Sequence, residues 1–144
     1  MEWAALIAWI VTAGGGFVLL SIWLARGGMQ QGRELQGLRI RPILILSHFL
    51  LAATGLVIWI VYVFSDSDSL AWVAFVLLLV VAGLGFAMFA IWYQRRQRGA
   101  VREAVDPGTP AEQHFPVTIV TLHGLLAVTT LTLVFLSAIG VGGS

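Results

Sequence analysis

The chain has 144 residues, of which 59% are hydrophobic and 10% are charged. Soluble domains carry about 25% charged residues, so the composition excludes an ordinary water-soluble domain. There is no cysteine, which excludes disulfide exchange, iron–sulfur clusters, thiolate ligands and c-type haem attachment. The formal net charge is only +1, and the arginine clusters need no nucleic acid to explain them.

Four apolar stretches follow one another, at about residues 3–25, 42–64, 70–93 and 115–140. None contains Asp, Glu, Lys or Arg, and about 20 apolar residues suffice for a helix to cross a hydrocarbon core of about 30 Å. The first stretch lacks the basic start and short apolar core of a signal peptide, so we expect it to be a helix of the protein. The sequence therefore predicts an all-α membrane protein, with residues 1–144 forming a single transmembrane domain of four helices.

Local signals mark where these helices begin and end. Gly27 and Gly28 follow the first stretch and are typical helix breakers. Pro42 and Pro116 stand at the beginnings of the second and fourth stretches, where proline suits the first helical turn. Asp68 and Ser69 are the candidate N-caps for the third helix.

The arginines predict how the chain lies in the membrane. All eight fall in two clusters, between residues 26 and 41 and between residues 95 and 102. The charged residues of the loop between the second and third stretches are both acidic, Asp66 and Asp68. Because positive loops stay in the cytoplasm, we expect loops 26–41 and 94–114 to be cytoplasmic and both termini to lie outside. The expected location is the cell membrane.

Each half of the chain contains the same two motifs. H-x-L-L-A-x-T-x-L occurs at 48–56 and at 123–131, and G-x-G-F-x-x-x-x-I-W-x-x-R occurs at 14–26 and at 83–95. The spacing between copies is similar, 69 residues from Gly14 to Gly83 and 75 from His48 to His123. A two-helix hairpin is therefore repeated in tandem.

The repeats cover about 3–64 and 70–140, and both hairpins enter the membrane in the same sense. A parallel repeat of this kind is related by an axis along the membrane normal. We expect an antiparallel four-helix bundle with pseudo-two-fold symmetry, in which the second and fourth helices lie diagonally across the core.

Each repeat places one histidine within the membrane. His48 lies six residues after Pro42 and His123 seven after Pro116, so each is roughly 9–11 Å inside the cytoplasmic end of its helix. An ionisable residue at this depth is expected to face the bundle interior. The residues four and seven positions further along share the histidine's face, and all four are small: Ala52, Gly55, Ala127 and Thr130.

Small neighbours leave room for a flat ligand between the histidines, although close helix packing favours them too. Haem fits a pair of imidazoles in apolar surroundings, whereas zinc usually takes three or four protein ligands. The Gly14-x-Gly16 and Gly83-x-Gly85 pairs would let the first and third helices approach the ring edge, or only pack closely.

Paired histidines on the second and fourth helices of a four-helix membrane bundle resemble bis-histidine b-type cytochromes, such as membrane anchor subunits of respiratory enzymes. The resemblance implies one haem b per chain, with His48 and His123 as axial ligands of the iron. Its propionates would need cations, and candidates at the cytoplasmic helix ends are Arg39, Arg41 and Arg95. Bidentate pairing of arginine with a carboxylate supports that assignment.

The resemblance implies electron transfer between a partner and the quinone pool or another redox protein. The alternative is a non-catalytic membrane subunit, a quinone-binding or assembly protein without haem. A small transporter is a third reading, which the lack of charged or broken-helix features at the midplane disfavours. The expected partners are the lipid bilayer and a protein partner or a second copy of the chain. No nucleophile–base pair occurs, so we do not expect the isolated chain to be an enzyme.

Overall fold

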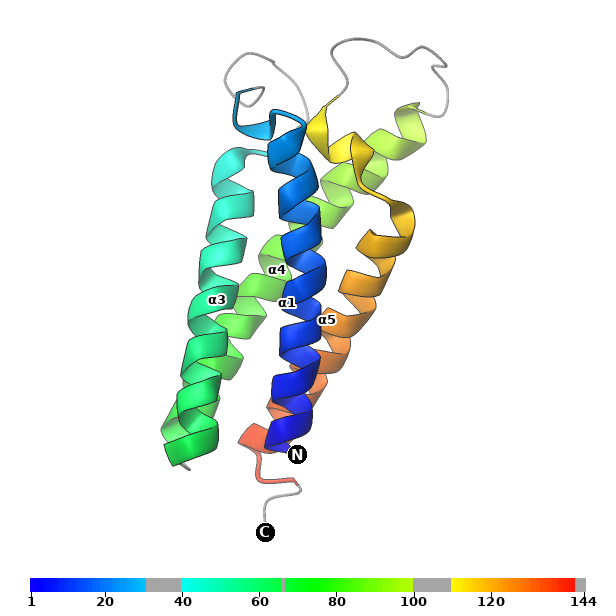
Figure 1. The fold of residues 1–144 in the computed structure, drawn as a ribbon. Coiled ribbons are helices and arrows are strands. Elements are labelled where there is room, and N and C mark those ends of the chain that lie inside the picture. The colour runs from blue at the N-terminus through cyan, green and yellow to red at the C-terminus, as the bar shows by residue number, and fades with distance from the viewer. Residues whose placement is uncertain (31–39, 66, 100–109, 142–144) are drawn as a thin grey trace.

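The computed structural model describes residues 1–30, 40–65, 67–99 and 110–141. Within them the regular elements are helices only (Figure 1). The long helices are α1 (Glu2–Ala25), α3 (Pro42–Ser65), α4 (Asp68–Gly99) and α5 (Val117–Ala138), and the short 3₁₀ helix is η1 (Ala111–His114).

The prediction of four helices able to span a membrane is confirmed, since four described helices are long and apolar enough to do so. Helix α3 begins at Pro42 as predicted. Helix α1 ends at Ala25, and its C-cap Arg26 is followed by Gly27 with φ of 72°. Helix α4 runs to Gly99, beyond the apolar stretch that ends near residue 93. The residues beyond this stretch include arginine and glutamine, which are good helix formers.

The four helices lie side by side (Figure 1). Both termini lie at one end, here called the terminal end, and η1 lies at the other, here called the loop end. The most extensive contacts join α1 to α5 and α3 to α4, whereas α1–α3 and α4–α5 contacts are smaller. The larger contacts therefore join helices from different sequence repeats.

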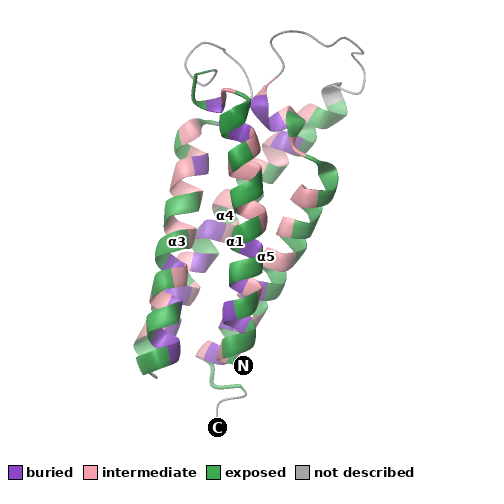
Figure 2. Ribbon diagram, in the orientation of Figure 1, coloured by how far each residue is buried: buried purple, intermediate pink, exposed green. Residues whose placement is uncertain are grey.

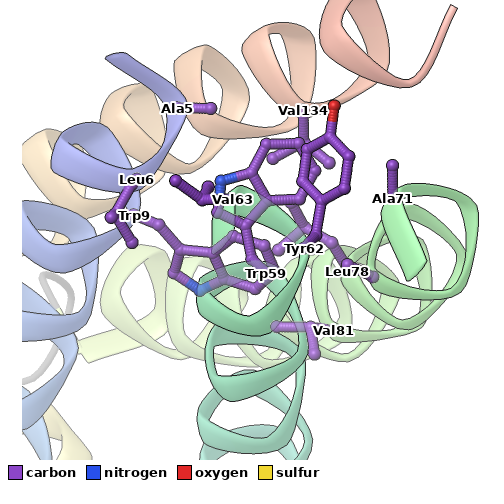
Figure 3. Close-up of a cluster of buried hydrophobic side chains, with 11 residues drawn as sticks. Ala5, Leu6, Trp9, Trp59, Tyr62, Val63, Ala71, Leu78, Val81 and Val134 are labelled. Carbon is purple, nitrogen blue, oxygen red and sulfur yellow. The ribbon is translucent and has the colours of Figure 1, made fainter. Parts of the chain in front are cut away.

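Two buried clusters hold the helices together. The cluster nearer the terminal end is shown in Figure 3 and includes Trp9, Trp59 and Tyr62 from α1 and α3. The cluster at the loop end comprises Trp23, Ile40, Ile45, Trp92 and Ala111. The two histidines lie between these clusters along the helices.

The helices carry many exposed segments (green in Figure 2), and large apolar side chains are numerous among the exposed residues. Phe86 is 76% exposed, Phe64 74% and Ile43 66%. Large apolar side chains so exposed would be costly in water, at about 25 cal/mol per Å², but they are suited to lipid. The exposed surface is thus consistent with contact with a bilayer.

Candidate functional site

The structure brings the two intramembrane histidines together. His48 lies on α3 and His123 on α5, yet their ring centroids are only 6.3 Å apart, with an angle of 66° between the ring planes. Both side chains are half-buried. The rings meet between helices whose backbones make no close contact in the described part of the chain.

Each histidine is held by a hydrogen bond to a backbone carbonyl of a neighbouring helix. Nδ1 of His48 lies 3.0 Å from the carbonyl oxygen of Val81 on α4, and Nδ1 of His123 lies 3.0 Å from that of Thr12 on α1. A carbonyl oxygen only accepts, so Nδ1 must carry the proton and donate it. In the neutral ring the lone pair is then on Nε2.

Glycines allow the rings to approach these carbonyls. A Cβ added to Gly16 would lie 3.0 Å from Cε1 of His123, and one added to Gly85 would lie 3.1 Å from Cε1 of His48. In an α-helix the N–H of residue i+4 already bonds the carbonyl of residue i, so Gly16 and Gly85 stand directly over the carbonyls of Thr12 and Val81. Their missing side chains leave access to the second lone pair of each oxygen.

The carbonyl and the glycine beside one histidine occupy the same positions in the sequence motifs as those beside the other. Thr12 and Val81 are 69 residues apart, as are Gly16 and Gly85, and this is the offset between the glycine motifs. Each histidine therefore bonds the equivalent carbonyl of the other repeat, because His48 reaches α4 and His123 reaches α1. Of the paired glycines, Gly14 and Gly83 have no neighbour within 4 Å of an added Cβ.

The predicted small neighbours have different surroundings in the two halves. Gly55 is buried, and a Cβ added there would lie 3.0 Å from the Trp9 indole. Thr130 is 1% exposed, and its hydroxyl lies 3.0 Å from that of Thr12. Ala52 and Ala127 are half-buried.

The structure describes two of the three arginines that were predicted to contact the propionates. Arg41 is exposed and precedes α3, and Arg95 is half-buried on α4. Both belong to the loop end of the molecule. Arg39 lies outside the described residues.

The loop end also contains buried polar groups that sequence reasoning missed. Glu112 on η1 is 3% exposed, and its Oε1 accepts a hydrogen bond of 3.4 Å from the amide of Ile40. Nε1 of Trp92 and Nε2 of Gln113 are buried and have no hydrogen-bond partner among the described residues. The guanidinium of Arg96 lies 5.6 Å from the centre of the Trp92 ring.

The carbonyls that hold the histidines were also missed, because a backbone acceptor has no signature in the sequence. The repeat offset is the signal that could have shown that residues 12 and 81 are equivalent.

The described residues contain no group of three or more His, Cys, Asp or Glu side chains able to hold a metal ion.

Comparisons with known proteins add no relative to this description. The chain matches no protein-family model, and comparison with the curated proteins and with the solved structures finds no significant match.

Proposed function

We propose that the chain is a small membrane haem b protein in which His48 and His123 are the axial ligands of one haem iron. The observation that carries the proposal is the pair of imidazoles 6.3 Å apart, each anchored through Nδ1 to a carbonyl oxygen. Ligating histidines almost always donate their other ring N–H to a carboxylate, a backbone carbonyl or water. The arrangement thus supplies two oriented nitrogen donors.

The separation of the rings also suits an ion between them. A metal–imidazole nitrogen bond is about 2.0–2.1 Å, so two rings that bind one ion from opposite sides would have centres roughly 6 Å apart. The centroids are 6.3 Å apart. Two protein ligands are too few for a structural zinc site but fill both axial positions of a haem.

The geometry supports the following roles for the residues. When bound, haem would supply reversible one-electron chemistry. His48 and His123 would hold its iron, and the carbonyls of Val81 and Thr12 would fix the orientation of each ring. Gly16 and Gly85 would allow these hydrogen bonds to form. With such a site the chain would pass electrons between a partner and the quinone pool or another redox protein.

The wider architecture belongs to the same proposal. The helices would form an antiparallel bundle built from a duplicated hairpin, with its pseudo-two-fold axis along the membrane normal. The chain would lie in the cell membrane with both termini outside and the loop end in the cytoplasm. This orientation is supported by the arginine clusters at residues 26–41 and 95–102 and the acidic residues 66 and 68.

The alternative is a membrane subunit without haem, for assembly or quinone binding. One observation favours it: each ring already has a protein hydrogen bond and contacts the other ring edge to face. A water donating to both Nε2 atoms would satisfy the pair. A quinone carbonyl, which only accepts, would require a proton on Nε2 and would fit the observed bonds less well.

An optical spectrum separates these functions. The protein would be expressed with added haem precursor, purified in mild detergent, and measured oxidised and then dithionite-reduced. We expect a Soret band with resolved reduced α and β bands, lost in His48→Ala and in His123→Ala. The matched control is His114→Ala, because His114 is exposed on η1 and should not affect the spectrum.

Added imidazole provides the second arm. It should restore part of the haem spectrum in the two alanine variants, because free imidazole can occupy the space left by the removed ring and replace the missing ligand. A wild-type protein with no visible absorption after expression with haem would refute the haem proposal and favour the subunit without haem.

A further inference from the structure

We infer that the loop end holds a binding site for an anionic oxygen, in which the buried N–H groups of Trp92 and Gln113 receive a propionate of the bound haem. The inference rests on the proposed function. It starts from the two orphan donors, because a buried donor without a partner costs about 1–3 kcal/mol. Such groups are few in native structures and require an explanation.

Trp92 is suitably placed for this role. It lies seven residues after Gly85, the residue against His48, so it is on the same face of α4 about 10.5 Å nearer the loop end. Trp92 is only 4% exposed, and its Nε1 has no acceptor among the described residues. A carboxylate arm from the edge of a ring between the histidines would extend into this region.

Gln113 belongs to the same region. Trp92 and Ala111 are members of one buried cluster, and Phe115 packs against it. Gln113 lies on η1, between Ala111 and Phe115 in the chain. Its Nε2 is buried and has no hydrogen-bond partner among the described residues. Two donors that lack acceptors at one end of the bundle indicate a ligand that brings only acceptors.

The charges at the two ends favour this orientation of an anion. Arginines that the structure describes lie at the loop ends of the helices: Arg26 after α1, Arg41 before α3, and Arg95 and Arg96 on α4. At the terminal end the charged side chains are acidic, as in Glu2 and Asp68. A carboxylate is therefore more stable at the loop end.

Glu112 is the opposing charge. Its buried carboxylate would repel a second anion, but it already accepts the amide of Ile40 and so has a structural partner. His114, also on η1, is exposed. The site thus has two neutral donors and one opposing carboxylate, and the guanidinium of Arg96 lies 5.6 Å from the centre of the Trp92 ring.

The test compares haem with its dimethyl ester, which lacks the propionate charges. Affinity of each porphyrin would be measured by optical titration of the full-length apoprotein in phosphatidylcholine nanodiscs. Trp92→Phe should weaken haem binding about tenfold, as expected for a lost hydrogen bond to a charged group. The same variant should change binding of the dimethyl ester by less than twofold.

Trp23→Phe is the matched control. Trp23 is the repeat counterpart of Trp92, seven residues after Gly16, equally buried and packed against Gly28. It should affect both porphyrins alike. Gln113→Ala, on the short helix outside the bundle, gives a second variant and should selectively weaken haem in the same direction as Trp92→Phe.

Equal weakening of both porphyrins in Trp92→Phe would overturn the inference, since it would show a packing role. If Trp92→Phe changed the affinity for haem and for its dimethyl ester alike, and only in phosphatidylglycerol nanodiscs, the inference would also be overturned. The anionic oxygen would then belong to a lipid phosphate. Failure of the wild-type protein to bind either porphyrin would refute the proposed function itself. Normal binding of both porphyrins by Trp92→Phe and Gln113→Ala would refute only the propionate site.

Discussion

At the scale of single residues, the orientation of the histidines depends on two glycines. Each imidazole reaches a helix carbonyl that would be covered by a side chain at residue 16 or 85. Heavy atoms pack best at about 3.5–4.0 Å, so an added Cβ at 3.0 or 3.1 Å would displace the ring. These glycines therefore have a specific steric role beyond helix packing.

Gly16→Ala and Gly85→Ala should lower the free energy of unfolding by about 1–3 kcal/mol, because a buried ring nitrogen would lose its acceptor. Gly14→Ala and Gly83→Ala are the matched controls, since nothing lies within 4 Å of their added Cβ atoms. The controls should gain about 0.5–1 kcal/mol from the better helix propensity of alanine. Equilibrium unfolding in mixed micelles measures both pairs. Equal stabilisation of all four variants would contradict the proposed role.

The hydroxyl pair on one side of the site gives a second prediction. Thr130→Val removes the 3.0 Å contact with Thr12 and should cost about 0.6 kcal/mol, the average for hydrogen bonds between membrane helices. Thr129→Val is the control, because its exposed hydroxyl bonds only its own helix at Leu125. The same unfolding assay applies, and an equal loss in both variants would show that the interhelical bond contributes nothing.

At the scale of elements, the beginning of α1 is tied to the end of α3. The hydroxyl of Tyr62 donates to Oε1 of Glu2 at 3.1 Å, and the indole of Trp59 donates to the backbone oxygen of Glu2 at 3.4 Å. These bonds lie at the terminal end, where Tyr62 is 5% exposed. They connect two helices of one repeat whose other contacts are relatively few.

Tyr62→Phe should therefore destabilise the protein by about 1 kcal/mol, the usual contribution of a buried hydrogen bond. Tyr93→Phe is the comparison, since Tyr93 is 49% exposed and bonds Gln97 of its own helix. It should change stability by less than about 0.5 kcal/mol. Thermal unfolding in detergent followed by circular dichroism would compare them, and equal midpoints would contradict a role for the Glu2 contact.

The elements were also the part most readily predicted from sequence. Four uncharged apolar stretches predict four spanning helices, because backbone groups in lipid must be bonded internally. The proline before α5 and the glycines after α1 indicated their limits. The length of α4 was underestimated, since hydropathy detects the membrane-facing part and not the polar turns that continue the helix.

The site was predictable only in its most visible residues. The repeated motif and the similar spacing of each histidine from the proline before it predicted that His48 and His123 lie at one level. In the structure their rings lie close together. The partners of the rings could not be predicted, because they are carbonyl groups present in every residue. The contacts of Trp9 with Gly55 and of Thr12 with Thr130 depend on helix rotation, which a strongly apolar sequence leaves undefined.

At the scale of the whole molecule, the proposed orientation can be tested directly because the chain has no cysteine. Single cysteines would be placed at Ser67, before α4, and at Gln97, near its other end. In intact cells a membrane-impermeant maleimide should label Ser67→Cys, and it should label Gln97→Cys only after permeabilisation. The reverse pattern would overturn the proposal that both termini lie outside.

The contacts around the histidines differ between the two halves of the molecule. Beside His123 the repeat has hydroxyls at residues 12 and 130, whereas the equivalent positions beside His48 are Val81 and Gly55, and Trp9 covers the glycine. The two histidines are matched in position, but His123 has threonine hydroxyls on one side, whereas the corresponding side of His48 has a valine, a glycine and an indole ring. Two histidines with identical surroundings would be equivalent. Because these surroundings differ, the two histidines are chemically distinct, and the line between their rings runs from a hydroxyl-bearing side to an aromatic side.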